Sequence, residues 1–162
     1  MIQQKGEIQI RKVVETDLKI VMEIEQLLRD DGRKQIWSFS FESYWEIFNP
    51  NASFVAELDG EVVGFVAGKI VKRERRNSIF GRLHTGEPFS LHDWVGWVDM
   101  IGILPKHYHK GIGKMLMEAF YQECKRHNAV MRSVVYDNDE RFKSFLTSMG
   151  FKESNVVIYE RS

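Results

Sequence analysis

Residues 106–114, KHYHKGIGK, contain the residue types that bind phosphate. Two glycines, Gly111 and Gly113, follow lysines and histidines, and apolar residues at helical spacing come after them. Glycines at the start of a helix let an anion approach the free backbone N–H groups, which together carry about half a positive charge. Further donors nearby are the side chains of His109, Lys110 and Lys114. The stretch therefore predicts a site for a phosphorylated ligand.

The glycine spacing does not match two well-known phosphate motifs. The dinucleotide fingerprint Gly-x-Gly-x-x-Gly needs a third glycine where Leu116 stands, and the Walker pattern needs another glycine before Gly111. The pair alone also leaves open a simple alternative, a flexible turn between a strand and a helix.

Asp99 is the one carboxylate in the apolar run 95–104. Burial in such a run raises the pKa of a carboxyl group toward the range in which it acts as a general base near neutral pH. The alternative is a structural carboxylate, bonded to a backbone N–H or paired with an arginine. Trp94 and Trp97 beside it are predicted to belong to the core.

The histidines raise the question of a metal site. His107 and His109 form a His-x-His pair, and His84 and His92 precede them, but the spacing matches no tetrahedral zinc pattern. We therefore predict no metal. Cys124 is the one cysteine of the chain, so no intramolecular disulfide forms, and its place in a helix pattern predicts packing.

Alternating apolar patterns predict the elements that position these residues. Strands are expected at 8–14, 54–58, 62–70, 95–104, 130–136 (of the buried type) and 156–160. Helices are expected from an N-cap at Thr16 to a stop at Gly32, and at 41–48, 111–127 and 139–149. The apolar face of helix 111–127 comprises Ile112, Met115, Leu116, Ala119, Phe120 and Cys124. Asp59-Gly60 predicts the tight turn of a hairpin.

Length and charge bound the class of protein. The 162 residues predict a single domain, 1–162, with a mixed sheet and helices on both faces. The 23 basic and 23 acidic residues cancel, which disfavours a dedicated nucleic-acid binder. No run reaches the roughly 18 apolar residues of a membrane span. We expect a cytoplasmic protein with no membrane partner.

The order of these features resembles the GNAT N-acetyltransferase superfamily. Its signature Gln/Arg-x-x-Gly-x-Gly/Ala is similar to YHKGIG (108–113), and NDERFKSFLTSMGF (138–151) resembles its second motif. IQIRKVVETDLKIVMEI (8–24) looks like its first strand and helix. The resemblance implies an α/β (α+β) fold with a mostly antiparallel mixed sheet of six to seven strands. It also implies that parallel strands 4 (95–104) and 5 (130–136) splay apart.

The resemblance further implies an acetyl-CoA-dependent N-acyltransferase in which the amine attacks the thioester directly. The oxyanion would be stabilised by a backbone N–H of strand 4, that of Ile103, and Asp99 would serve as the base. The implied cofactor contacts come from Ile101, Gly102, Ile103, Tyr108, His109, Lys110, Gly111, Ile112, Gly113, Lys114 and Asn138.

Three positions depart from the family pattern. Tyr108 replaces the family's glutamine or arginine, so Lys110 or His109 is expected to supply the cation. Leu146 stands where the family has a tyrosine that protonates the departing CoA thiolate. That proton must therefore come from water, Tyr136 or Ser148, and we predict Tyr136 as the general acid. The family's asparagine fits Asn138 or Asp139, of which we name Asn138.

The sequence therefore predicts an N-acetyltransferase that acts on a primary amine of a protein, a peptide or a small molecule through a ternary complex. Two alternatives stay open: a catalytically weak CoA-binding module, and an RNA-associated protein that uses the basic segment 71–82. The long segment 71–94 is either a solvated loop or a surface that docks the acceptor. The oligomeric state, including a dimer, is left open.

Overall fold

The computed structural model describes residues 6–32, 41–48, 50–72 and 93–154. The strands are β1 (Ile8–Lys12), β2 (Phe54–Leu58), β3 (Glu61–Lys72), β4 (Trp94–Ile103) and β5 (Ala129–Ser133). The α-helices are α1 (Leu18–Asp30), α2 (Phe41–Phe48), α4 (Ile112–Arg126) and α5 (Glu140–Ser148). Two 3-10 turns are η1 (Glu15–Asp17) and η2 (Pro105–His107).

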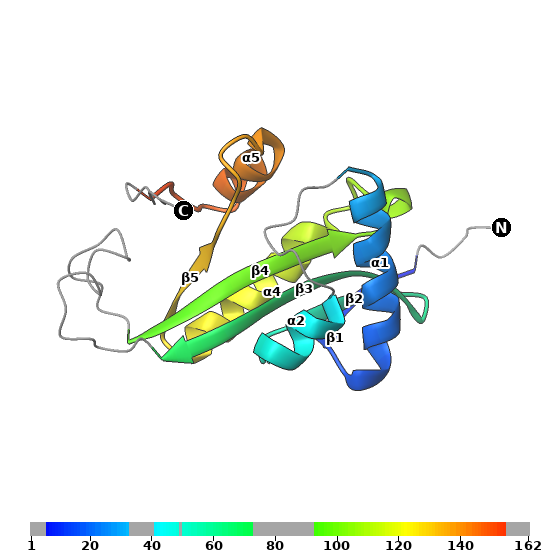
Figure 1. Ribbon diagram of the computed structural model, residues 1–162, viewed down its shortest axis with the longest axis horizontal. Helices are drawn as coiled ribbons and strands as arrows, with labels where there is room; N and C mark the ends of the chain where they lie inside the picture. The colour runs from blue at the N-terminus through cyan, green and yellow to red at the C-terminus, as the bar shows by residue number, and fades with distance from the viewer. Residues whose placement is uncertain (1–5, 33–40, 49, 73–92, 155–162) are drawn as a thin grey trace.

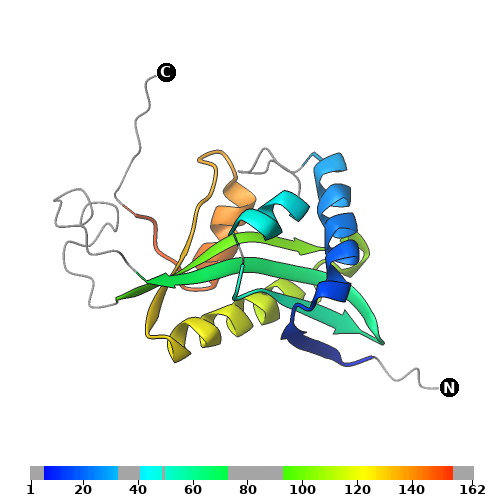
Figure 2. The same cartoon turned by 60° about the horizontal axis from the view of Figure 1, so that its bottom comes forward.

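The strands form one mixed sheet in the order β1-β2-β3-β4-β5. All neighbours are antiparallel except β4 and β5, which are parallel, as predicted. Helix α4 covers one face of the sheet, and α1 with α2 covers the other (Figures 1 and 2). The sheet has five strands within the described residues, whereas six to seven were predicted, and the predicted strand 156–160 lies outside those residues.

Strands β4 and β5 pair along only half of β4. The paired residues run from Trp94 with Ala129 to Val98 with Ser133, and among the described residues no strand pairs with β4 on this side from Asp99 to Ile103. We call Trp94–Val98 the paired half and Asp99–Ile103 the open half. Figure 1 shows that β5 and the residues that follow it in the sequence turn away from β4 toward α5. This is the predicted splay.

Strand β5 is shorter and less buried than predicted. It ends at Ser133, because beyond that residue the chain leaves β4 and its pairing with β4 stops. Only Ala129 of its five residues is buried, so the prediction of a buried strand through 136 was wrong. The residues that follow, Val134 and Tyr136, are exposed.

The core forms two layers, one on each face of the sheet. Under α4 the buried side chains are Ile112, Leu116, Met117, Phe120 and Cys124. Met115, which was predicted for this face, is 38% exposed, because the buried stripe is centred one position further round the helix. On the opposite face Val21, Ile24, Tyr44 and Phe65 form the second layer.

The first helix begins later than predicted. Thr16 lies within the turn η1, and Asp17 is the N-cap of α1. The Asp17 carboxylate accepts the Val14 N–H at 2.9 Å and two Arg11 N–H groups at 2.7 and 2.9 Å. These bonds turn the chain immediately after β1, which therefore ends at Lys12.

Two turns were predicted correctly from glycine positions. Asp59 and Gly60 have φ values of +52° and +83°, as the tight hairpin turn between β2 and β3 requires. Gly150 has φ +86°, and the N–H groups of Gly150 and Phe151 bond to Thr147 O and Leu146 O. This ends α5 in a Schellman motif and fixes where the helix stops.

Within the described residues, no helix is both long and apolar enough to cross a lipid bilayer.

Candidate active site

Asp99 occupies a β-bulge at the boundary between the two halves of β4. Ala67 of β3 pairs with Met100 and Gly68 pairs with Val98, so Asp99 is the extra residue between them. A bulge re-aims the side chain it carries and bends the strand. The pairing with β5 ends at the residue before Asp99. The predicted base therefore stands where the two parallel strands part.

A tyrosine on another element holds the Asp99 carboxylate. The Tyr44 hydroxyl, on α2, donates to Asp99 Oδ2 at 2.6 Å, and the Tyr44 side chain is fully buried. Burial raises the pKa of Asp99, while the Tyr44 hydrogen bond and the charge of Lys69 oppose the rise. Burial and the Asp99 charge raise the pKa of Tyr44, which keeps the phenol protonated as the donor.

Sequence reasoning missed both partners of Asp99. Tyr44 lies in the predicted helix 41–48 and Lys69 in the predicted strand 62–70, and neither was connected with Asp99. The available signal was chemical, since a buried tyrosine hydroxyl needs a hydrogen-bond partner. The sequence does not say which partner the fold brings to it.

The open half of β4 turns part of its backbone away from β3. The Leu104 N–H donates to Val63 O at 2.9 Å, so Leu104 faces β3. Peptide groups alternate along a strand. The N–H of Ile103 therefore points to the opposite side, where β5 no longer pairs. This geometry suits an oxyanion donor at Ile103.

The other two predicted residues of this stretch have packing roles. Ile101 is 8% exposed and belongs to the α4-side core. Gly102 is buried, and a Cβ there would lie 2.6 Å from Phe65 Cε1 and 2.8 Å from Leu28 Cδ1. Packing alone therefore explains a glycine at 102. Contact of these residues with a cofactor stays a prediction.

The glycine pair forms the start of α4, as predicted. Gly111 is the N-cap with φ +80°, and no side chain caps the helix there. His109 also has positive φ, +62°. The first turn of α4 contains no acidic residue. A Cβ built on Gly111 would have no neighbouring atom within 4 Å, so the surface there is open. The N–H groups of the first turn therefore point to a surface that suits an anion.

Gly113 serves a different purpose from Gly111. A Cβ at 113 would lie 3.2 Å from Ile103 Cδ1 and 3.5 Å from Phe145 Cζ. The helix thus approaches β4 and α5 closely at this point. Ile112 between the glycines is 1% exposed, so only its backbone remains to meet a ligand.

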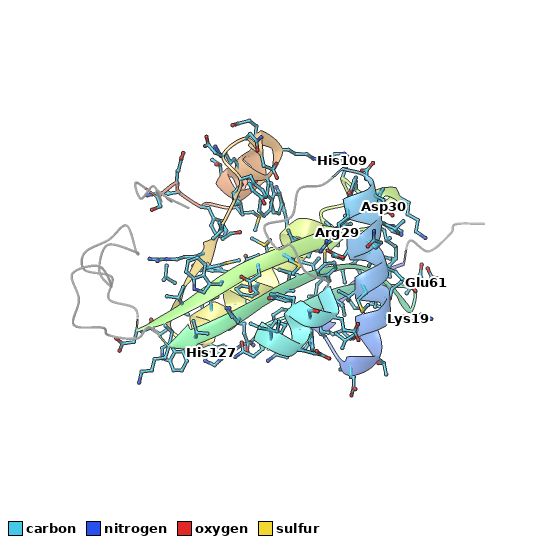
Figure 3. The ribbon with its side chains drawn as sticks, viewed as in Figure 1. Lys19, Arg29, Asp30, Glu61, His109 and His127 are labelled. Atoms are coloured by element: carbon cyan, nitrogen blue, oxygen red, sulfur yellow. The ribbon has the colours of Figure 1, made fainter. Side chains whose placement is uncertain are left out.

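The cations around this helix start are not all free to bind a ligand. Lys110 Nζ lies 3.1 Å from His107 Nδ1, which accepts a hydrogen bond from the ammonium group. Burial and the charges of Lys110 and Lys106 lower the pKa of His107, while the charge of Glu61 opposes this, and the lowered pKa favours the neutral imidazole. His109 is exposed and, in the view of Figure 3, lies near Asp30 at the end of α1.

Beyond Val98 the chain that follows β5 diverges from β4 (Figure 1), and we call the space between them the opening, with β4 and the start of α4 as one wall and residues 134–148 as the other. The Asp139 carboxylate accepts the Phe142 N–H at 2.9 Å and so caps α5, whereas Asn138 remains exposed. Leu146 is buried in the core, and the exposed Ser148 hydroxyl donates to Phe145 O at 2.6 Å. Tyr136 is 40% exposed on this wall. An acid role for Tyr136 or Ser148 stays a prediction.

The predicted site residues thus fall into three groups around one opening. Asp99 and Ile103 lie on β4, residues 108–114 lie at the start of α4, and Tyr136 with Asn138 lies between β5 and α5. Among the described residues no three His, Cys, Asp or Glu side chains gather as a metal site. His84, His92 and residues 73–82 of the basic segment lie outside those residues.

Comparison with known families bears directly on this arrangement. Residues 21–151 match the model of the acetyltransferase (GNAT) family, which is most of the chain. The chain belongs to this family. The match runs from α1 to the end of the second motif, so it includes Asp99, the glycine pair and α5. The family resemblance and its fold are thereby confirmed.

Individual relatives are more distant. A mycothiol acetyltransferase of Acidothermus cellulolyticus is 31% identical over 117 residues, which cover 70% of this chain and 34% of that protein. The chain spans about a third of the length of that relative.

Solved structures share the fold over their whole length. An aminoglycoside N-acetyltransferase, AAC(6')-Iy in complex with CoA, matches with a TM-score of 0.72 at 21% identity, covering 100% of this chain and 99% of that one. AAC(6')-IG of Acinetobacter haemolyticus matches with a TM-score of 0.68 at 20% identity, covering 95% and 97%. At such identities the likeness shows the fold alone.

Proposed function

We propose that this protein transfers the acetyl group of acetyl-CoA to a primary amine by direct attack within a ternary complex. The observation that carries the proposal is the opening beside β4. A half-buried carboxylate stands where β5 leaves β4, the Ile103 N–H points into the opening, and the helix α4 begins next to it without a capping side chain.

The residues fit acetyl-CoA in two respects. The uncapped start of α4, with Gly111 in a left-handed conformation, suits the pyrophosphate. On the side where β5 leaves β4, the backbone at Ile103 suits the amide-bearing pantetheine arm, which can add to a strand as another strand would. The co-substrate itself supplies the activated acyl group, a thioester.

Asp99 acts as the base in this proposal. Most amines have a pKa of about 10 and bind as ammonium ions, so a proton must leave before the nitrogen can attack. Asp99 takes that proton, directly or through water. The Ile103 N–H then stabilises the oxyanion as the carbon–nitrogen bond forms and the carbon–sulfur bond breaks. The departing thiolate receives a proton from water or Tyr136.

The acceptor is best sought first among small molecules. The relatives named above include a mycothiol acetyltransferase and aminoglycoside N-acetyltransferases, whose names refer to small molecules. A protein or peptide amine remains the second class. Leu146, a buried leucine at the position of the family's acid, favours one alternative function, a CoA-binding module without turnover.

Two assays test the proposal. At 100 times its Kd, acetyl-CoA adds about 2.7 kcal/mol of stability, which raises Tm by roughly 5–10 °C for a domain of this size. Release of the CoA thiol is then followed with amino sugars, diamines and peptides. Binding with amine-dependent thiol release supports the proposal. Binding without release from any amine supports the CoA-binding module, and no Tm shift excludes both.

A further inference from the structure

Tyr108 holds an arginine that comes from another part of the chain. The guanidinium carbon of Arg141, on α5, lies 5.3 Å from the centre of the Tyr108 ring. An arginine over an aromatic face is held by cation–π attraction. Tyr108 precedes the start of α4, and Arg141 follows β5, so this contact joins the two walls of the opening.

A second contact shows that Arg141 is on the side of α5 that meets α4. Phe145 lies one helical turn after Arg141, and its Cζ is 3.5 Å from the position that a Cβ on Gly113 would occupy. Residues four apart lie on the same face of a helix. Arg141 therefore lies beside the glycine pair, on the face that α5 presents to the start of α4.

The carboxylates around Arg141 are bound to other groups. Asp137 pairs with Lys143 at 2.8 Å, Glu140 lies 3.7 Å from the same ammonium group, and Asp139 caps α5. Within the described residues Arg141 forms no salt bridge. Residues 105–114 contain no acid at all. The guanidinium is thus held in place by a ring that does not neutralise its charge.

We propose that Arg141, oriented by Tyr108, binds the pyrophosphate of acetyl-CoA. The proposal rests on the function proposed above and adds a residue to it. The family signature has a glutamine or arginine at position 108, and here α5 supplies the cation from the opposite wall. Lys110, one expected substitute, bonds to His107 instead. The planar guanidinium fork binds two phosphate oxygens at once, which a lysine does not do.

The test measures the affinities of three ligands for Arg141→Gln. Acetyl-CoA and its form without the 3'-phosphate both carry the pyrophosphate, whereas acetyl-pantetheine lacks it. Loss of a charge-assisted bond predicts about 10-fold weaker binding of the first two and unchanged binding of the third. Arg132→Gln is the matched control, because Arg132 lies 6.0 Å over the Trp97 ring in the paired half. Its affinities for all three should equal those of the wild type.

Two variants of Tyr108 test the orienting role. Tyr108→Leu removes the ring and should resemble Arg141→Gln, whereas Tyr108→Phe keeps the ring and should lose less affinity for acetyl-CoA than Tyr108→Leu does. Equal losses for all three ligands would assign Arg141 a structural role and overturn the proposal. A loss confined to the ligand with the 3'-phosphate would overturn it too, as would wild-type affinity of Arg141→Gln. Failure of the wild-type protein to bind acetyl-CoA would instead overturn the proposed function.

Discussion

The paired and open halves of β4 belong to one strand but serve opposite purposes. The paired half is clamped between two strands, and its glycine at 96 lets α4 approach so closely that a Cβ would lie 2.2 Å from Cys124 Sγ. The open half carries the bulged Asp99 and faces the uncapped start of α4, and within the described part of the chain no strand pairs with it on the side of β5. The paired half serves the fold, whereas the open half packs Ile101 and Gly102 into the fold and, in the proposed function, also presents polar groups to acetyl-CoA.

Asp99→Asn should produce the largest effect and separate chemistry from stability. The amide oxygen still accepts the Tyr44 hydrogen bond but takes no proton, so the rate of acetyl transfer should fall by about 10²–10⁴-fold. Acetyl-CoA affinity should stay the same. The measurement is turnover beside a binding titration. A variant that keeps its full rate would remove Asp99 from the mechanism.

Gly96→Ala should damage the paired half alone. The added methyl group collides with Cys124, so the free energy of unfolding should fall by about 1–3 kcal/mol, while the folded protein should bind acetyl-CoA normally. Denaturant titration and ligand titration measure the two quantities.

Gly111→Ala is the counterpart in the site. No atom lies within 4 Å of its Cβ position, but φ is +80°, and the left-handed conformation costs an alanine about 1 kcal/mol. Acetyl-CoA affinity should fall as well. If both glycine variants changed affinity equally, the division between the two halves would be wrong.

Tyr44→Phe should shift the pH dependence of turnover. The Tyr44 hydrogen bond lowers the pKa of Asp99, so its removal raises that pKa further above the ordinary value. Because the base must be ionised, the acid limb of the pH–rate profile should move to higher pH. The control is Tyr121→Phe, a 45% exposed tyrosine of α4. An unmoved limb would show that Asp99 is not the group that titrates.

Asp17 and Asp99 should respond to acid in opposite ways. The Arg11 hydrogen bond holds the pKa of Asp17 below its usual 3.8, so this pair stabilises the fold above that pH and is lost as pH falls through the folded value. Asp99 has a raised pKa, so its protonation favours the folded state as pH falls.

Asp17→Asn should therefore lower stability by about 1 kcal/mol or less near neutral pH, since Arg11 is partly exposed. The difference should vanish at strongly acidic pH. Thermal unfolding from pH 7 to pH 2.5 measures it, and a difference that persists at the acidic end would contradict the assignment.

Local rules predicted much of this molecule from its sequence. The Asp59-Gly60 turn, the helix start at Gly111 and the end of α5 at Gly150 depend on residues close in the chain, and each is present. Asp99 could be singled out because it interrupts an apolar run.

The tertiary partners of the site residues could not be predicted from the sequence. The bulge at Asp99 depends on its register with β3, and the hydrogen bond from Tyr44 spans 55 positions. The contact of Arg141 with Tyr108 depends on how α5 packs. Such pairings arise from tertiary structure, and a single sequence contains no pattern that names the partners.

Hydrogen exchange of backbone amides tests the central claim most directly. Exchange is followed for β4 and the start of α4 with and without saturating acetyl-CoA. We predict new protection at Ile103 and at residues 111–114, with little change across the paired half, whose amides are already bonded within the sheet. Binding that left Ile103 and the start of α4 unprotected, or that protected another face of the molecule instead, would contradict the account.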